Sequence, residues 1–269
     1  MDNQEKKLSE ARQLVRDLGA LGEVRAPSDL IPMVLGRVGL ADVYFSLASP
    51  IGPVFVSWNE RGISALMPGE DAARFEQAFR ARFGRSARRI DEAPRDLARA
   101  IEKQLSSGRA QGLSFDLRGL SEFEQAVLHK ALEIPRGEVR PYAWVAVVIA
   151  HPQAVRAVGT ALGRNPIPLL IPCHRVVRSD GRVGNYALGG EAKWALLRAE
   201  GVEPDRLEEL AGKGVRYYGS DTTRIYCYPT CQHARRILEE HRVAFRSAAE
   251  AARVGYRPCK VCRPVAVAA

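Results

Sequence analysis

Four of the five cysteines form two close pairs in the C-terminal part of the chain, Cys227 with Cys231 and Cys259 with Cys262. Two thiol pairs at such spacings can surround one tetrahedral zinc ion. A segment of this length buries little apolar surface by itself, so a bound metal would be needed to hold it folded. The spacing therefore predicts a zinc site made of these four side chains, with four separate structural thiols as the alternative.

Length and composition indicate several folded domains. The chain has 269 residues, of which 46% are hydrophobic and 26% charged, and this length exceeds one typical domain of about 150 residues. The longest apolar run, 143–150, is far below the roughly 18 residues that a membrane-spanning helix needs. Charged side chains interrupt the first twenty residues, which therefore lack a secretory signal. We expect a cytoplasmic protein without membrane contacts, whose thiols stay reduced.

Positive charge is concentrated in two zones of the sequence. The net charge is +9, and residues 136–178 contain six arginines and one acidic residue, while residues 215–269 contain ten basic and four acidic residues. Clustered cations neutralise phosphates more effectively than dispersed ones. Two contact surfaces for nucleic acid are one interpretation, and solvated surface arginines are the other.

The first half of the chain has the pattern of a small α/β layer domain. Three segments alternate apolar and polar residues, which is typical of β-strands, and two other segments are amphipathic helices. The strands are expected at 43–47, 54–58 and 113–117, and the helices at 72–83 and 94–105. Together they predict a layered domain over 43–118. Residues 1–42, with helical spacing over 4–18, are expected to form a helical extension whose role the sequence does not indicate.

From Ser121 onward the apolar residues follow a helical pattern. Ser121 and Glu124 have the spacing of a capping box, and Pro141 suits the start of a second helix that should stop near Ala150. A third helix is expected over 153–164. Two helices joined by a tight turn and flanked by arginines have the outline of a helix-turn-helix motif, although most such pairs only pack a core.

Three small residues, Ala154, Ala157 and Ala161, fall on one face of this third helix, which also carries Arg156. An alanine face lets another backbone approach closely. That backbone could belong to a neighbouring helix or to a nucleic acid, and the residues themselves leave both open.

The fifth cysteine, Cys173, is followed directly by His174 and Arg175. A thiol attacks as its thiolate, and nearby cationic or hydrogen-bonding groups favour that form. His174 could accept the proton if a carboxylate oriented its second nitrogen, and Glu200, in a helix expected over 193–200, is the candidate. A buried structural cysteine is the alternative.

Further motifs accompany Cys173 on both sides. They are Ile171 to Val176, Val183 to Tyr186, Lys193 to Gly201 and, upstream, Pro135 to Val139, Tyr142, Ala154 and Asn165-Pro166. These motifs closely resemble the O6-alkylguanine-DNA alkyltransferase family, over roughly residues 43–203 and most specifically over 121–203. The resemblance implies an α/β multidomain fold, with a small ribonuclease H-like α/β layer over 43–118 and a helical, winged-helix-like alkyltransferase domain over 119–204.

The resemblance also implies direct-reversal DNA repair by a methylated-DNA–protein-cysteine methyltransferase that is consumed in a single turnover. The alkyl group of O6-alkylguanine, and of O4-alkylthymine, would move irreversibly to Cys173 after the base has been flipped out of double-stranded DNA. His174 and Glu200 would relay the thiol proton through water. Tyr142 would donate to the departing guanine, and Asn165 would brace the turn behind the third helix.

The same resemblance places the third helix in the minor groove, with Arg156 filling the space left by the flipped base. This groove is only about 6 Å wide, which suits small side chains. The residues expected to contact DNA are Ala154, Arg156, Ala157, Gly159, Ala161 and Arg164. The base pocket is expected to comprise Leu162, Val176, Tyr186 and Ala187, with main-chain groups of Cys173, Val176 and Ala187 reading the base. The implied protein acts as a monomer on alkylated DNA, in the cytoplasm and associated with the nucleoid.

Two other classes of function remain open at this stage. A non-catalytic sensor of alkylated DNA, or a transcriptional regulator, would use the same pocket and tail without transferring the alkyl group. A redox thiol protein with a zinc site is the third class, but it would have no use for Tyr142, Arg156 and Asn165.

The cysteine-rich tail resembles a different protein domain from the one that the motifs around Cys173 resemble. Residues 222–227, 255–260 and 262–264 are similar to the metal-binding domain of the Ada methyltransferases, which implies a small zinc-bound α+β module over 215–269 and a second methyl acceptor, Cys227, for DNA phosphotriesters. This chain has Tyr228 where that family usually shows Arg, and it lacks room before Tyr217 for a regulatory helix-turn-helix domain. Transcriptional activation is therefore not expected, and a structural or DNA-docking zinc module remains the alternative for the tail.

Overall fold

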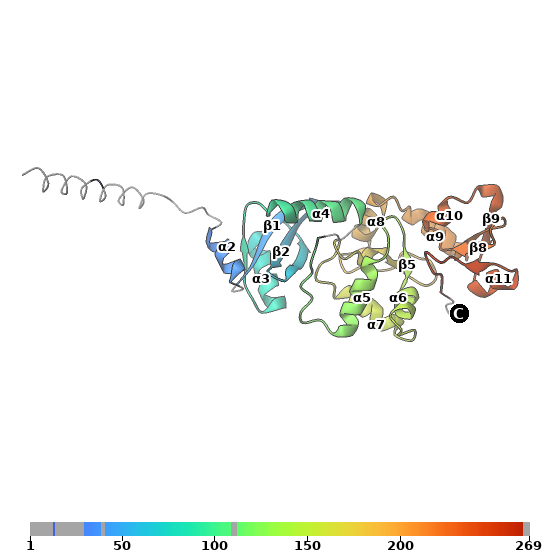
Figure 1. The fold of residues 1–269 in the computed structure, drawn as a ribbon, viewed down its shortest axis with the longest axis horizontal. Coiled ribbons are helices and arrows are strands. Elements are labelled where there is room, and N and C mark those ends of the chain that lie inside the picture. The colour runs from blue at the N-terminus through green and yellow to red at the C-terminus, as the bar shows by residue number, and fades with distance from the viewer. Residues whose placement is uncertain (1–12, 14–29, 39–40, 109–111, 266–269) are drawn as a thin grey trace, which may run out of the picture.

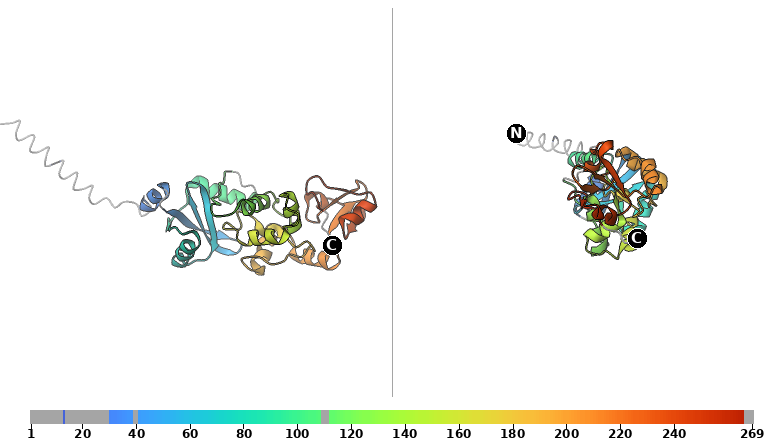
Figure 2. Two further views of the ribbon diagram at one scale, coloured as in Figure 1. Left: turned by 90° about the horizontal axis from the view of Figure 1, so that it is seen from below. Right: turned by 90° about the vertical axis from the view of Figure 1, so that its right-hand side faces the viewer.

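The computed structural model describes residues 13, 30–38, 41–108 and 112–265 (Figure 1). The helix expected over 4–18 lies outside the described residues except for residue 13, and the described part of the N-terminal extension is helix α2 (Leu30–Arg37). Three groups of elements follow one another along the long axis of the molecule (Figures 1 and 2). The first is a sheet with two helices, the second is mostly helical, and the third is a smaller sheet with short helices.

The first group is a four-stranded sheet of order β3-β2-β1-β4. Its strands are β1 (Asp42–Ser49), β2 (Gly52–Asn59), β3 (Gly62–Pro68) and β4 (Ala87–Arg89), and its helices are α3 (Ala72–Phe83) and α4 (Arg95–Ser107). Strands β1, β2 and β3 are antiparallel neighbours, whereas β4 pairs with β1 in parallel. Alternate residues of β1 face opposite ways: Tyr44 packs with Phe75 and Phe79 of α3, while Val43 and Phe45 belong to the main core.

These elements confirm most of the predicted layer and correct two parts of it. Both predicted hairpin strands and both predicted helices are present. The predicted strand over 113–117 is wrong, because this segment makes only an isolated bridge from Phe115 to Ile63. The strand that fills the place beside β2 is β3, in which Ile63 to Leu66 are all buried. A strand buried on both faces shows no polar alternation, so its sequence carries no period-two signal.

The second group contains the segments around Cys173. Its helices are α5 (Glu122–Leu132), α6 (Tyr142–Val148), α7 (Val155–Gly163), α8 (Gly190–Ala199) and α9 (Pro204–Gly212). The short strands β5 (Arg140–Pro141) and β6 (Val176–Val177) pair in parallel, and a 3-10 turn, η1 (Cys173–Arg175), precedes β6. The predicted capping box at Ser121 and Glu124 is present. Helix α6 ends two residues before Ala150, which adopts φ 62° and so cannot continue the helix.

The third group is a four-stranded sheet of order β10-β8-β7-β9. Its elements are β7 (Tyr217–Ser220), β8 (Ile225–Cys227), α10 (Gln232–Arg235), η2 (Glu239–His241), β9 (Arg242–Phe245), α11 (Ala248–Arg253) and β10 (Arg257–Pro258). Rings of Tyr217, Tyr226, Tyr228, Phe245 and Tyr256 supply most of the apolar core beside the four cysteines. The structure as a whole is a mixed α/β fold with several sheets. Among the described residues, no helix combines the length and apolar character needed to cross a bilayer.

Candidate functional site

Cys173 lies at the inner end of a small cavity. The segment from Asn165 to Cys173 follows α7 and returns the chain to the core, so that Cys173 is 5% exposed. The cavity has a volume of about 170 Å³ and is lined by Tyr142, Gly159, Leu162, Gly163, Cys173, Asn185, Tyr186 and Ala187. The sulfur therefore adjoins a hollow bounded by α6, α7 and the segment before α8.

Two side chains hold the sulfur in place. Asn165 Nδ2 donates to Cys173 Sγ at 3.1 Å and to the carbonyl of Ile171 at 2.9 Å, and its Oδ1 accepts from the Ile167 amide. Tyr186 Oη is 3.9 Å from Sγ. Burial raises the pKa of the Cys173 thiol, although the contacts with Asn165 and Tyr186 act in the opposite direction. The cysteine therefore rests as a thiol and needs a base to become nucleophilic.

His174 and Glu200 form a hydrogen-bonded pair that has the chemistry of such a base. Nε2 of His174 is 3.0 Å from Glu200 Oε1. Among the described residues, the buried Nδ1 of His174 has no hydrogen-bond partner. Burial lowers the pKa of His174, which favours the neutral ring at physiological pH. With Nε2–H donating to the carboxylate, Nδ1 is left as the proton acceptor.

Glu200 stays ionised although it is mostly buried. Burial would raise its pKa, but hydrogen bonds from His174 and Arg175 outweigh this effect and lower the pKa to about 2. Arg175 donates from Nε to Oε2 at 2.8 Å and from Nη2 to Oε1 at 2.7 Å. Its Nη1 donates to the carbonyl of Ile134 at 2.6 Å. Arg175 is therefore the buried counter-charge of the carboxylate.

Replacing Glu200 by glutamine is expected to flatten the dependence of stability on acid pH. An unfolded glutamate has a pKa of about 4.3, so the depressed folded pKa contributes stability that is complete above about pH 4.3 and is lost as pH falls towards 2. This contribution to the free energy of unfolding is about 3 kcal/mol. Denaturant unfolding at a series of pH values measures it.

The matched control for this comparison is Glu239→Gln, which makes the same change at an exposed position. Its unfolding free energy should follow that of the parent protein at every pH. If the unfolding free energy of Glu200→Gln fell with acid pH as steeply as that of the parent protein, Glu200 would not be the buried carboxylate with the lowered pKa.

Lys193, in the motif from Lys193 to Gly201, holds two segments of the site together. It is 0% exposed, and its Nζ donates to the carbonyls of Val176 and Val183 at 2.7 Å each and of Asn185 at 3.4 Å. Burial lowers its pKa to about 8. Lys193 thus ties β6 to the segment that carries Tyr186. Nothing in its place along the chain distinguishes it from a surface lysine.

The predicted base-pocket residues do not all reach the cavity. Leu162, Tyr186 and Ala187 line it, and so does Gly159, which was predicted to contact DNA. Val176 is buried and does not line it, and its carbonyl accepts from Lys193.

Helix α7 presents an exposed face, but the alanine pattern predicted for it is wrong at one position. Arg156, Ala157 and Arg164 are exposed and Ala154 is half-buried, whereas Ala161 is 2% exposed and packs in the main core with Val158 and Leu162. The helix is shorter than predicted, and Ala161 lies next to Leu162 on its inner side. Ala161 therefore cannot contact a partner on the exposed face.

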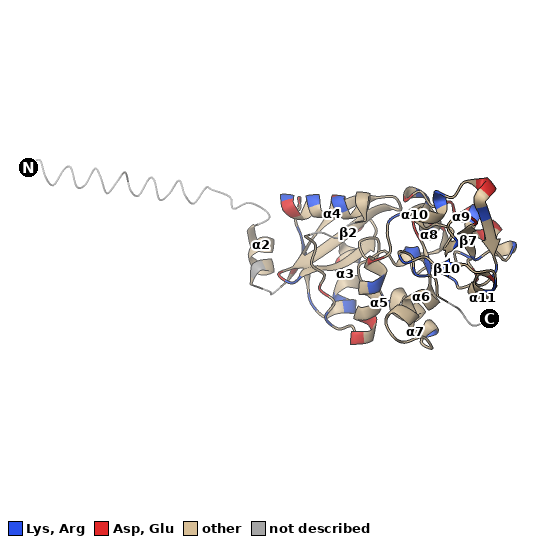
Figure 3. Ribbon diagram, turned by 45° about the vertical axis from the view of Figure 1, so that its right-hand side comes forward, with Lys and Arg blue, Asp and Glu red and all other residues tan. Residues whose placement is uncertain are grey.

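The basic residues over 136–178 do not all lie on the surface, as both interpretations of this zone required. Arg140 is 2% exposed and forms an ion pair with Glu138, and Arg175 is 1% exposed and paired with Glu200. Arg156, Arg164 and Arg178 remain exposed. Figure 3 shows basic positions on α7 and across the C-terminal group.

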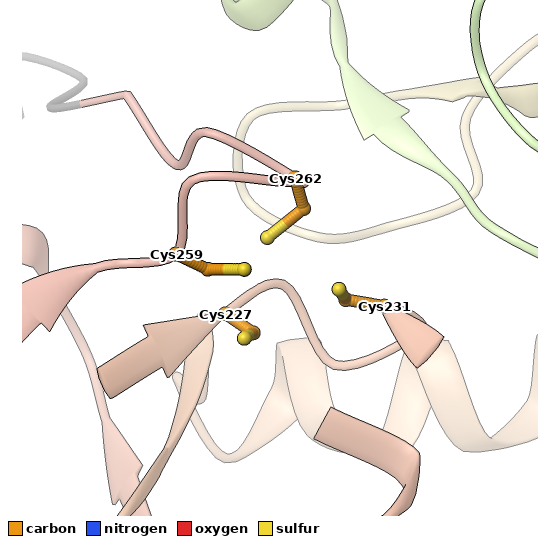
Figure 4. Close-up of side chains that lie close together, drawn as sticks. All are labelled: Cys227, Cys231, Cys259 and Cys262. Atoms are coloured by element: carbon orange, nitrogen blue, oxygen red, sulfur yellow. The ribbon is translucent and has the colours of Figure 1, made fainter. Parts of the chain in front are cut away.

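The four paired cysteines converge at one point. All four are buried, and their Sγ atoms lie within 4.8 Å of one another. Figure 4 shows the sulfurs pointing towards a common centre. Pairing of β10 with β8 brings Cys259 beside Cys227, and Cys231 is the N-cap residue of α10. Four thiols at these distances form the closed, sulfur-only ligand set that structural zinc sites use, and they fit a zinc ion.

A larger cavity, of about 520 Å³, adjoins this cluster. Both Cys227 and Cys259 line it, together with the basic or titratable side chains of His233, Arg236, His241, Arg257 and Lys260. Two of the four metal-site cysteines, Cys227 and Cys259, therefore line a cavity that also has positively charged side chains in its wall.

Comparison with known proteins identifies relatives of both regions. Residues 122–202 match the family model of the 6-O-methylguanine DNA methyltransferase DNA binding domain, and residues 209–265 match that of the metal binding domain of Ada. The methylated-DNA–protein-cysteine methyltransferase of Methanosarcina barkeri is 39% identical over 160 residues, which cover 58% of this chain and 96% of that protein.

Two further proteins, one a curated relative and one a solved structure, are also similar to this chain. The Escherichia coli bifunctional transcriptional activator/DNA repair enzyme Ada is 34% identical over 177 residues, which cover 64% of this chain and 49% of Ada. The crystal structure of Mycobacterium tuberculosis OGT in complex with DNA aligns with 61% of this chain and 98% of that chain, at 31% identity and a TM-score of 0.48.

Proposed function

This chain belongs to the methylated-DNA–protein-cysteine methyltransferase family, and on that premise we propose that Cys173 takes the alkyl group from O6-alkylguanine, and from O4-alkylthymine, in duplex DNA. The protein is a direct-reversal DNA repair enzyme with a DNA-binding alkyltransferase domain and a zinc-binding domain. The single observation that carries the assignment of Cys173 is the cavity of about 170 Å³ that this residue lines, with the hydrogen-bonded His174 and Glu200 as the next residues along the proton path.

The transfer needs one base for the thiol proton and one group that donates a proton to the departing guanine. The thiol proton passes through a water molecule to Nδ1 of His174, while Glu200 stabilises the charge that forms on the ring. The sulfur of Cys173 bonds to the alkyl carbon as the bond from that carbon to O6 breaks, and the guanine departs with the electron pair. Tyr142, which lines the cavity, donates a proton to the departing guanine. The proton taken up by His174 then passes through solvent to the Tyr142 phenolate, so the net reaction exchanges the thiol proton for the alkyl group.

The product explains why each molecule acts once. A thioether is a very poor leaving group at neutral pH, so no later step restores the thiol of Cys173. Asn165 keeps the segment before Cys173 folded through its three hydrogen bonds, and Tyr186 forms one wall of the cavity.

Alkyl transfer requires the target base to leave the duplex, because its O6 substituent is inaccessible to the sulfur within the base stack. We assign Arg156, exposed on α7, to the space vacated by the base. The exposed Ala157 and the half-buried Ala154 keep this helix narrow where it faces the minor groove. Arg164 is exposed and forms a surface ion pair with Glu124 at 3.1 Å, and we assign it to a DNA phosphate that would take the place of this carboxylate.

The domain boundaries and subfolds form part of the same proposal. Residues 43–118 constitute a ribonuclease H-like layer, 119–204 a winged-helix-like catalytic domain and 215–269 a small α+β zinc module, and the protein acts as a monomer at the nucleoid. The order of strands in each sheet supports this division, since within the described part of the chain no sheet joins strands from two of these ranges.

Cys227 is proposed as a second acceptor, for the methyl group of a DNA methylphosphotriester. Among the four metal-site cysteines it is the one at the end of β8, and it lines the cavity of about 520 Å³ with Arg236, Arg257 and Lys260. These cations would hold the flanking phosphates. Zinc bound by four thiolates would keep the sulfurs ionised at neutral pH. A module that only docks on DNA is the competing role, because Tyr228 occupies the position where Ada proteins usually have Arg.

Methyl mapping by peptide mass spectrometry is the test of both assignments. Duplex DNA with O6-methylguanine should add one methyl group to the peptide that contains Cys173, and duplex DNA with a methylphosphotriester should add one to the peptide that contains Cys227. An unmodified Cys173 in folded protein with excess substrate would refute repair and favour a non-catalytic reader of alkylated DNA. An unmodified Cys227 would leave the metal module as a scaffold.

A further inference from the structure

The metal-ligand loop between Cys227 and Cys231 packs directly on the alkyltransferase domain. Thr230 Oγ1 accepts from the Val139 amide at 2.9 Å, and the Gln232 amide donates to Glu138 Oε1 at 2.9 Å. The residues that receive these contacts, Glu138 and Val139, lie in the turn between α5 and β5. The loop that supplies two metal ligands therefore makes one hydrogen bond to the other domain through Thr230, and Gln232, the first residue of α10, makes a second.

A buried cation reinforces this contact. The guanidinium of Arg140 lies 5.5 Å from the ring centre of Tyr228 and 5.8 Å from that of Trp144, and it is paired with Glu138. Tyr228 is itself buried, and its hydroxyl accepts from the Val265 amide. Separating a buried cation from its carboxylate and aromatic partners costs free energy, because the charge would be left buried without compensation. These contacts therefore resist displacement of Tyr228 from Arg140.

The same turn is connected to the active site on its other side. The Gly137 amide donates to Glu200 Oε2 at 3.4 Å. Arg140 pairs with Val176 in the β5–β6 ladder, three residues after Cys173, and Pro141 directly precedes Tyr142. Segment 137–141 therefore touches the carboxylate, the strand after the nucleophile and the start of the helix that carries the proton donor.

We propose that the Cys227–Cys231 loop is a positioning element for alkyl transfer at Cys173, acting through Glu138, Val139 and Arg140. This inference rests on the proposed function of Cys173. A folded metal loop fixes segment 137–141, which in turn holds Glu200 and Tyr142 in register with the sulfur. The metal module is then part of the machinery for base repair, in addition to any reaction of its own.

The test measures single-turnover transfer of methyl from O6-methylguanine duplex DNA at saturating DNA in the full-length protein. Thr230→Val removes the acceptor of the Val139 amide, and it should lower the first-order rate constant of transfer about fivefold or more. Affinity for undamaged duplex DNA should stay unchanged, and hydrogen exchange at Val139 should accelerate. Thr230→Ser keeps the hydroxyl and should restore the rate constant. Thr223→Val makes the same change at an exposed position of the module and should leave it unchanged.

A second pair of variants keeps the inference falsifiable if Thr230→Val does not fold. Tyr228→Leu removes the ring that covers Arg140 and should slow transfer, whereas Tyr228→Phe keeps the ring and should not. An unchanged rate constant in Thr230→Val despite faster exchange at Val139, or equal rates in both Tyr228 variants, would overturn the inference. Absence of transfer in the parent protein would instead refute the proposed function.

Discussion

Replacing Cys173 by serine is expected to abolish methyl transfer from O6-methylguanine DNA, with a fall in rate of at least about a thousandfold. A hydroxyl ionises far less readily than a thiol, and the nearby His174 cannot compensate for the weaker nucleophile. Serine is small enough for the buried site, and its oxygen can still accept from Asn165 Nδ2, which lies 3.1 Å from the sulfur in the parent protein. The measurement is the transfer of a labelled methyl group to protein.

The control in that experiment is DNA binding. The Cys173→Ser variant should bind duplex DNA that contains O6-methylguanine as tightly as the parent protein does, since the exposed face of α7 is unaltered. Methyl transfer that persists near the parent rate would contradict the assignment. Mass spectrometry of the peptide that contains Cys227 would then show whether the second sulfur had accepted the group.

Removal of zinc is expected to unfold the C-terminal module while the sheet over β1 to β4 stays folded. Structural zinc sites contribute roughly 10 kcal/mol or more to the folding of small modules, and this module has only a small core around five aromatic rings. After chelation, amides in β7, β8 and β9 should exchange within seconds, while amides in β1 and β2 stay protected. Hydrogen exchange followed by mass spectrometry, with zinc content measured on the same samples, provides the test.

Two serine variants separate the metal site from the rest of the chain. Cys262→Ser removes a ligand and should unfold the module even with zinc present, whereas Cys173→Ser should retain zinc and the folded module. Full protection of β7 and β8 in metal-free protein would show that the four cysteines are not needed to hold the module together.

Much of the active site and metal site could be predicted from the sequence because their residues sit in short, continuous motifs. Cys173 and His174 are adjacent, and each metal pair spans five residues or fewer, so local backbone geometry already brings the members close. The family assignment and the zinc site were predicted on this basis, and both agree with the family models and with the sulfur cluster. The capping box at Ser121 is local in the same way, and it is confirmed.

The helices were predictable because their burial is one-sided: α3 and α4 carry a clear apolar period, since one face of each is more exposed than the other. Strands β1 and β2 were predictable from alternating residue types, although four consecutive residues in each are buried. Strand β3 is buried on both faces and gave no such signal. Segment 113–117 has an alternating pattern, but it meets only Ile63 in a bridge, because a strand also needs a neighbour with free backbone groups.

Only the tertiary structure decided which charges are buried. Arg140, Arg175 and Lys193 read in the sequence as ordinary basic side chains, and the fold places all three in the interior. Arg175 meets Glu200 from 25 positions away, and the Val139 amide meets Thr230 from 91 positions away. The cost of burying a charge or an amide depends on the partner that the fold supplies. The sequence by itself thus predicted Cys173 as the reactive sulfur and the four clustered cysteines as metal ligands, whereas the contacts that link the two regions through segment 137–141 are long-range and no local pattern encodes them.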